Sequence, residues 1–174
     1  GTSWTDIPIE ITCRGPVRFA PGEQSAVFRK QVDLLRVYPN GESDQINGEM
    51  LAVHFGRRRD AAVPPGDSRQ PTPAKARSPV AGLQPRRIEA QGHPVIVRAP
   101  SQDAQARGDR LEYDLQTGHI VLDGDQGTFL RQGNNEIHAP HLEYQLGQQG
   151  GLGQAAADGP GWIRAQLPGR TPQP

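Results

Sequence analysis

Cysteine is nearly missing from this sequence of 174 residues, since Cys13 is the only one. The chain can therefore form neither an internal disulfide nor a cysteine-rich zinc site. Aromatic residues are scarce at 5%, and hydrophobic residues reach only 34%, below the usual ~45–50%. Because 21 glycines and 17 prolines accompany so little apolar material, we expect one domain with a thin, turn-rich β structure rather than a large compact core.

Long apolar runs are missing as well. No stretch approaches the ~18 residues that a helix needs to cross a bilayer. No window combines sustained helical periodicity with a cap, so we expect little or no helix. The start of the chain shows no signal-like segment. Since the chain opens on Gly1 rather than methionine, we expect any signal or anchor to be absent from this fragment.

Charge is balanced overall but unevenly distributed. Lysine is represented only by Lys30 and Lys75, so arginine carries nearly all the positive charge. Between Gly56 and Arg87 there are eight basic and two acidic residues, which leaves 11 basic and 17 acidic residues elsewhere. Such asymmetry marks either an interaction segment or a soluble arginine-rich linker. Prolines interrupt every periodic pattern there, and we predict that residues 56–86 form a Pro/Arg-rich flexible insertion.

Nucleic-acid binding requires basic residues beside aromatic platforms. The basic insertion contains no aromatic residue, and the rest of the chain is acidic, so we expect no nucleic-acid partner. The run from Arg57 to Arg59 leaves open a peripheral contact with an anionic membrane surface, because guanidinium forks suit phosphate.

The dominant pattern in the chain is a repeated phrase, GDRLEYDL and APHLEYQL, which is apolar at every second position. A period of two is the strand period, so the apolar residues of each phrase share one face of a strand. They are Leu111, Tyr113 and Leu115 in the first phrase and Leu142, Tyr144 and Leu146 in the second.

The spacing of the phrases indicates stacked strands. Leu111 and Leu142 are 31 positions apart and Gly108 and Gly124 are 16 apart, which makes about 16 residues one strand with its turn. Residues 116–118 and the DGDQG segment at 123–127 have turn composition, so we predict turns at both places. A fainter third copy of the phrase runs from Gly48 to Phe55, with Leu51 and Val53 in the apolar positions.

Catalytic and metal motifs are weak throughout. The DGDQG segment places two carboxylates beside glycines, but a hard cation needs about six to eight oxygens, and a plain turn explains the pattern. The histidines, His138 and His141 among them, lack the H-E-x-x-H spacing of a helical zinc site. No G-x-S-x-G elbow is present. Two strand carboxylates such as Glu112 and Glu143 could pair as acid and base, but alternation favours solvent-facing positions, and we predict no enzyme, metal or cofactor.

Four segments together carry a family resemblance. They read A-x-G-x-x-V-x-V, then ARGDRLEYD-x-x-TG-x-I-x-L-x-G, then NEI-x-AP-x-LEY, and finally AAADGPG. This run resembles the OstA-like domain of lipopolysaccharide transport proteins, LptA and LptC among them. The segments lie at Ala90 to Val97, Ala106 to Gly124, Asn134 to Tyr144 and Ala155 to Gly161.

The resemblance covers residues 87–165 most clearly, and residues 7–55 match more loosely. It implies a single domain across residues 1–174, and the insertion at 56–86 is a departure from the family pattern. The composition of residues 166–174 predicts a disordered tail. The implied fold is an all-β, antiparallel, folded-over β-jellyroll in the periplasm. The resemblance also implies further OstA-like domains as partners, joined end to end by strand addition.

The resemblance also implies a groove for the acyl chains of lipopolysaccharide or a similar glycolipid. Apolar strand residues are the candidates for its wall, although each could equally be ordinary core. The candidates are Val95, Val97, Leu111, Tyr113, Leu115, Ile120, Leu122, Phe129, Leu142, Tyr144 and Leu146.

Three functions stay open at this point. The first is a non-enzymatic, lipid-handling protein, for which Leu111→Asp or Leu142→Asp is predicted to abolish lipid binding. The second is an assembly module that stacks by β-augmentation without a lipid ligand. The third is a carbohydrate-active or metal-dependent enzyme, which would require carboxylates or histidines to converge in a cleft.

Overall fold

The computed structural model describes residues 9–57, 83–146 and 152–164. Residues 7–8 of the loosely matching first part, the tail at 166–174 that is predicted to be disordered, and residues 58–82 of the predicted insertion lie outside the described residues. Within the described ranges, no helix is long and apolar enough to span a membrane.

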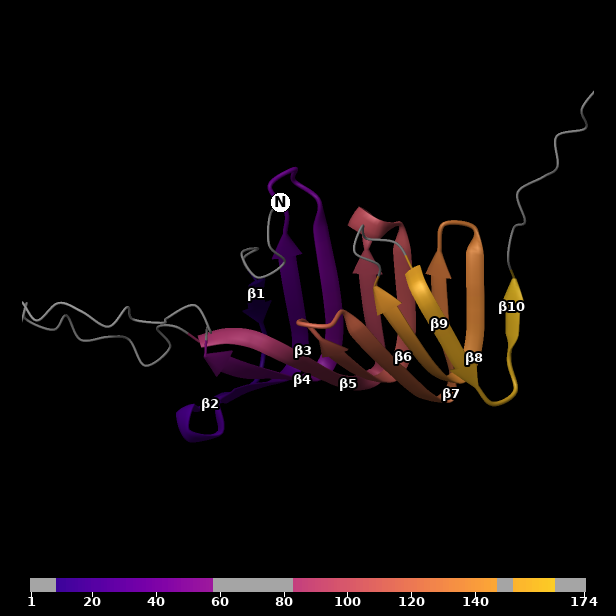
Figure 1. The fold of residues 1–174 in the computed structure, drawn as a ribbon. Helices are drawn as coiled ribbons and strands as arrows, with labels where there is room; N and C mark the ends of the chain where they lie inside the picture. The colour runs from indigo at the N-terminus through magenta and orange to yellow at the C-terminus, as the bar shows by residue number, and fades with distance from the viewer. Residues whose placement is uncertain (1–8, 58–82, 147–151, 165–174) are drawn as a thin grey trace, which may run out of the picture.

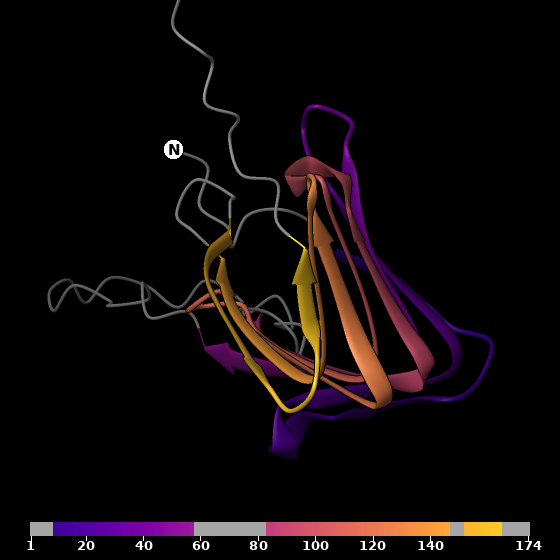
Figure 2. The ribbon, with the colours of Figure 1, turned by 90° about the vertical axis from the view of Figure 1, so that its right-hand side faces the viewer.

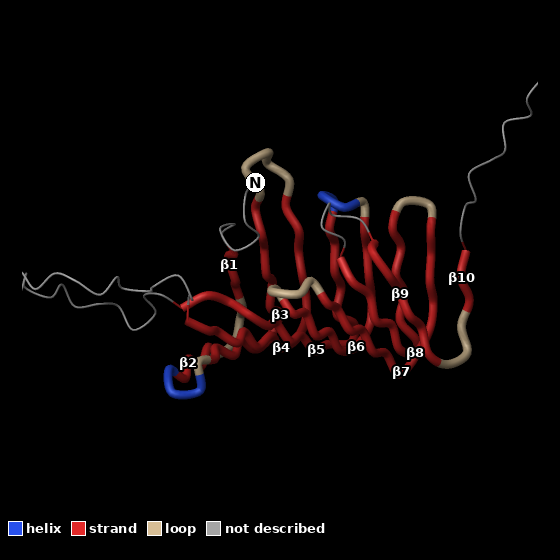
Figure 3. Tube along the Cα trace, viewed as in Figure 1, coloured by secondary structure: helices blue, strands red, loops and turns tan. Residues whose placement is uncertain are grey.

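Ten strands make up nearly all of the described structure, together with two short 3-10 turns (Figures 1 and 3). The prediction of an all-β chain with little helix is therefore confirmed. The elements are β1 (Ile9–Thr12), β2 (Val17–Ala20), η1 (Pro21–Glu23), β3 (Ser25–Val37), β4 (Ser43–Arg57), β5 (Leu83–Ala99), η2 (Pro100–Gln102), β6 (Ala104–Asp114), β7 (His119–Gln132), β8 (Asn135–Leu146), β9 (Leu152–Asp158) and β10 (Trp162–Arg164).

All ten strands belong to one antiparallel sheet, in the order β1-β3-β4-β5-β6-β7-β8-β10, with β2 also on β3 and β9 also on β8. The sheet therefore joins the loosely matching first part of the chain to the clearly matching second part. Two short strands form each end of the sheet. At one end β2 pairs with residues 25–28 of β3 and β1 with residues 33–36. At the other end β10 pairs with residues 136–138 of β8 and β9 with the later residues.

The long strands bend in the middle, so the sheet folds over into two layers that converge along a crease and diverge at the opposite side (Figure 2). The first layer contains the strand halves that continue into β2 and β9, and the second contains those that continue into β1 and β10. The ladders assign residues 25–29, 50–57, 83–91, 110–114, 119–123 and 141–146 to the first layer, and residues 32–37, 43–47, 95–99, 104–107, 128–132 and 135–139 to the second.

Glycines line the crease where the strand pairing shifts register. Gly48, Gly92, Gly108 and Gly124 lie at the register breaks in the middle of β4, β5, β6 and β7. Neighbouring backbones approach so closely there that a Cβ atom on Gly92 would lie 3.0 Å from the Glu49 nitrogen. Glycine permits this approach because it has no side chain.

The predicted turn at residues 123–127 is instead part of the crease within a strand. Strand β7 runs through this segment from His119 to Gln132 as one bent strand, with the irregularity between Asp123 and Thr128. The prediction was wrong because glycines mark a bulge inside a strand as well as a turn between strands. The predicted unit of about 16 residues still holds, since it corresponds to one bent strand plus its turn.

The predicted insertion also needs correction at both ends. Gly56 and Arg57 finish β4, and they pair with Gln84 and Leu83 of β5. Pro85 interrupts the sequence pattern, yet it sits at a register shift, where a proline is tolerated because the ladder is already irregular. Residues 56–57 and 83–86 therefore belong to the sheet.

The core lies between the two layers and follows the alternation of the strands. Leu111 and Leu142, from the two copies of the repeated phrase, are buried there, as are Leu51 and Val53 from the third copy. The third copy is thereby confirmed as an equivalent strand half. Ile9, Ile11 and Cys13 pack against the same core from the edge strand β1 and its end.

Candidate functional site: an apolar groove between the layers

A cavity of about 70 Å³ lies between the layers, toward the strand ends away from the crease. Its wall is mostly apolar, and a few polar side chains gather near the ends of β3, β4 and β5. It is lined by Ile9, Leu34, Arg36, Tyr38, Asp44, Gln45, Ile46, Ile88, Val97, Ala99, Gln102, Ala104, Gln105, Ala106, Leu111, Tyr113, Leu115, Ile120, Leu130, Gln132 and Tyr144.

The cavity brings together six of the residues that the sequence singles out for a groove wall. Three others, Val95, Leu122 and Leu142, are completely buried and belong to the core beneath the cavity. Leu146 ends β8, and its side chain lies outside the described residues. The six residues on the wall are Val97, Leu111, Tyr113, Leu115, Ile120 and Tyr144.

Phe129 does not lie where the sequence places it. It borders a hollow on the outer side of the crease with Arg107 and His138, away from the interior. Its neighbours in β7, Thr128 and Leu130, face inward instead, and the Thr128 hydroxyl donates to the Ala139 carbonyl at 2.6 Å. The alternation that places Leu122 inward also places Leu130 inward, so the apolar character of Phe129 was a misleading signal.

Several wall residues were missed by reasoning from the repeated phrase. Leu34, Ile46, Ile88, Ala106 and Leu130 come mainly from the earlier strands and from the second layer. Each alternates with polar or outward neighbours in its own strand, so strand periodicity could have found them.

The polar part of the wall centres on the Asp44 carboxylate. It accepts hydrogen bonds from the Tyr38 hydroxyl at 2.6 Å and from the Ser101 hydroxyl at 2.8 Å. Burial, with the hydrogen bond to Asp44 next in importance, raises the pKa of Tyr38 to about 12. Tyr38 therefore stays neutral and orients the carboxylate at the mouth of the cavity.

Arg36 is a buried charged residue on the cavity wall. Its side chain is only 6% exposed, and its guanidinium carbon lies 5.5 Å from the centre of the Tyr38 ring. Burial raises the pKa of Tyr113, while the charge of Arg36 and a hydrogen bond from it lower that pKa. Burial likewise raises the pKa of Tyr144. Both phenols are neutral at physiological pH, so they add no charge to the groove.

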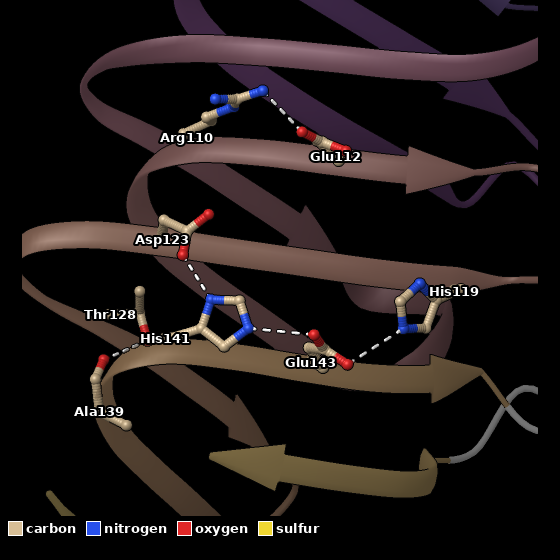
Figure 4. Close-up of polar contacts among 8 residues, drawn as sticks. All are labelled: Arg110, Glu112, His119, Asp123, Thr128, Ala139, His141 and Glu143. Atoms are coloured by element: carbon tan, nitrogen blue, oxygen red, sulfur yellow. Dashed lines mark hydrogen bonds and ion pairs between the residues drawn. The ribbon is translucent and has the colours of Figure 1, made fainter. Parts of the chain in front are cut away.

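The outer face of the first layer is polar and differs sharply from the groove. Figure 4 shows His141 between two carboxylates: Nδ1 lies 2.5 Å from Asp123, and Nε2 lies 3.1 Å from Glu143. The other oxygen of Glu143 lies 3.6 Å from His119. Hydrogen bonds to Asp123 and then to Glu143 raise the pKa of His141, so this imidazole keeps its proton to higher pH than usual.

This outer network lacks the geometry of a metal centre. Among residues 9–57, 83–146 and 152–164, no group of three or more histidine, cysteine or acidic side chains has the geometry to hold a metal ion. Asp123, Glu143 and His141 instead neutralise one another on neighbouring strands, as cross-strand pairs on a solvated face do. The cavity between the layers remains the candidate site.

The fold and the cavity together define a folded-over β-jellyroll with an apolar interior groove. The family model for the LptA/(LptD N-terminal domain) LPS transport protein matches residues 23–150, more than half of the chain. This protein therefore belongs to that family of lipopolysaccharide transport proteins, and the resemblance found in the sequence is confirmed.

A solved structure shows the same fold. LptH from Pseudomonas aeruginosa, described as the LptA-homologous periplasmic component of the lipopolysaccharide transport device, superposes with a TM-score of 0.61. The two sequences are 14% identical, and the match covers 94% of this chain and 98% of LptH. A search of curated proteins finds no match.

Proposed function

We propose that this protein holds the acyl chains of lipopolysaccharide or a related glycolipid in the groove between its layers, and that it carries the lipid across the periplasm toward the outer membrane without catalysing a reaction. The apolar cavity in a member of this transport family is the observation that carries the proposal. Each methylene moved from water into the groove contributes about 0.8 kcal/mol. A few carbons of each chain therefore supply useful affinity.

The size of the cavity implies that the layers move apart when lipid binds. Pockets that enclose a small organic ligand have volumes of about 300–1,000 Å³, whereas this one has about 70 Å³. The crease joins the layers on one side only, and the opposite side is where they diverge (Figure 2). Opening there would widen the groove without breaking the pairing of neighbouring strands.

The groove is tested by placing a charge on its wall. Val97 lies on the wall in β5 and is only partly buried, so we expect Val97→Asp to remain folded. A carboxylate facing the acyl chains should weaken the binding of purified lipopolysaccharide at least about tenfold, since the chains would then desolvate it. Native mass spectrometry and displacement of a fluorescent acyl probe would both report the loss.

A matched control is available on the same sheet. Val37 is 41% exposed and does not line the cavity, so Val37→Asp makes the same chemical change outside the groove. We expect it to bind lipopolysaccharide as the unaltered protein does. Equal binding by all three proteins, with Val97→Asp shown to be folded by circular dichroism, would rule out the groove.

The ends of the sheet support end-to-end association with further OstA-like domains. Exposed apolar side chains lie at both ends, Val17 and Phe19 on β2 and Trp162 and Ile163 on β10. Edge strands present unpaired backbone groups that accept another strand. Because each end carries one strand from each layer, head-to-tail addition would continue both layers and join successive grooves.

Ile163 offers a direct test of this association. It is 68% exposed in β10, and lysine at a sheet edge opposes strand addition. We expect Ile163→Lys to shift concentration-dependent oligomers toward monomer in analytical ultracentrifugation while the melting temperature stays the same. Unchanged oligomers would place the interface elsewhere.

A membrane contact through Arg57 to Arg59 stays a proposal, because Arg58 and Arg59 lie outside the described residues.

A further inference from the structure

A buried arginine is unexpected on the wall of a groove that holds acyl chains. In β3, Val32, Leu34 and Arg36 are all buried on the inner face, so strand alternation directs the Arg36 side chain inward with the two apolar ones. Burying a guanidinium group is costly unless strong partners compensate for it. A leucine or methionine would fill this position at no such cost if the wall had only to contact hydrocarbon.

The neighbours of Arg36 include two phenol side chains from opposite layers. The ring of Tyr38, at the end of β3 in the second layer, lies under the guanidinium at 5.5 Å. Tyr113, from β6 in the first layer, lines the same cavity; burial raises the pKa of its phenol, while the charge of Arg36 and a hydrogen bond from it lower that pKa. Arg36 and Tyr113 therefore line the groove from opposite layers. Asp44, the register partner of Arg36, is held in place by two hydroxyl donors, those of Tyr38 and Ser101.

An anionic ligand would replace a neutral partner of Arg36 by a stronger one. Hydrogen bonds between a guanidinium group and a carboxylate or phosphate are roughly twice as strong as neutral ones, and the planar fork can bind two oxygens at once. Next to an apolar wall the surrounding dielectric is low, which strengthens the pair further. The Tyr113 hydroxyl is the partner that an entering anion can displace, because separating the layers moves it away from β3.

We propose that Arg36 is the anion-binding residue of the groove, and that the preferred ligands are amphiphiles with a phosphate or carboxylate directly beside their acyl chains. The inference rests on the proposed function, since it assigns the charge that the acyl-binding groove selects. Without ligand, Arg36 holds Tyr113 and keeps the layers together. With ligand, the anion takes the place of Tyr113, and the layers separate around the chains.

The experiment uses the full chain and three probes with the same twelve-carbon chain: dodecyl phosphate, dodecanoate and uncharged dodecyl maltoside. Each probe competes with a neutral fluorescent acyl probe. We expect Arg36→Met to weaken the binding of the two anionic probes about ten- to a hundredfold, as the loss of a charge-assisted hydrogen bond predicts. The binding of the maltoside should stay the same or become tighter, because the layers then separate more easily. The ratio between the two anionic probes distinguishes phosphate from carboxylate as the preferred group.

A matched variant separates this role from a change in net charge. Arg131 is exposed on β7 and is not part of the cavity wall, so Arg131→Met removes the same charge without touching the groove. We expect it to bind all three probes as the unaltered protein does. An equal loss of anionic binding in Arg131→Met and Arg36→Met would overturn the proposal, because the effect would then be long-range.

A second variant keeps the proposal testable if Arg36→Met does not fold. Tyr113→Phe removes the neutral partner but keeps the cation, so we expect unchanged or tighter binding of dodecyl phosphate relative to the maltoside. Weaker binding of all three probes by the same factor would make the Arg36–Tyr113 contact purely structural and would overturn the proposal. Failure of the unaltered protein to bind any probe would instead contradict the proposed function, while equal affinity for charged and uncharged probes would contradict only the role of Arg36.

Discussion

Replacing Leu142 by aspartate should unfold the protein, well before any question of lipid binding arises. The Leu142 side chain is 0% exposed and belongs to the cluster that joins the two layers. The substitution removes the packing of a leucine and buries a carboxylate among apolar side chains. We expect a loss of about 4 kcal/mol or more in the free energy of unfolding, which is a large fraction of the ~5–15 kcal/mol that stabilises an ordinary domain. Thermal unfolding followed by circular dichroism would measure the loss.

The comparison for this variant is a leucine on the outer side of the sheet. Leu35 is partly exposed in β3 and is absent from both the core and the cavity wall. We expect Leu35→Asp to fold and to lose far less stability. If Leu142→Asp retained the melting temperature of the unaltered protein, the result would contradict the burial of Leu142 between the two layers. Leu111→Asp should unfold the protein for the same reason. Neither variant can therefore serve as the test of lipid binding that the sequence suggested.

The inner face of the first layer could be derived from the sequence because the repeated phrase alternates cleanly. Leu111 and Leu142 are buried, and Tyr113 and Tyr144 lie on the cavity wall, as the period of two requires. What the pattern could not separate is core from groove, since both are apolar positions on the same face. That separation depends on distance from the crease, which only the folded sheet defines.

Two features of the site were missed for a different reason, because the polarity of a side chain was given more weight than its position in the alternation. A charged residue in a strand is read as solvent-facing, so Arg36 was not a candidate, although its parity with Val32 and Leu34 placed it inward. The large apolar ring of Phe129 was read as inward, although its parity placed it outward. At both positions alternation is the better guide, because the backbone fixes the direction of the side chain before its polarity counts.

The second large effect is expected at the crease, from Gly108→Val. A Cβ atom on Gly108 would lie 2.8 Å from the Leu122 side chain and 2.9 Å from the Asp123 carbonyl oxygen. The side chain could shift, but the carbonyl belongs to the neighbouring strand and cannot move without disturbing the β6–β7 ladder. Valine adds two further carbons to the same space. We expect a loss of about 2–4 kcal/mol in the free energy of unfolding, measured by urea denaturation.

The reason for this loss distinguishes a crease from a turn. Gly41 has a positive φ of 86° and open space around it, so an alanine there would be strained by its backbone conformation alone, as in a turn. Gly108 has no such conformation, and its substitution is penalised only by the approach of the neighbouring strand. Gly22 has neither feature, and Gly22→Ala should be neutral or stabilising by up to about 1 kcal/mol. A Gly108→Val protein as stable as Gly22→Ala would mean that the layers do not meet at this glycine. A large loss in the free energy of unfolding, in contrast, would show that the 16-residue glycine spacing in the sequence marks the positions where the sheet folds over.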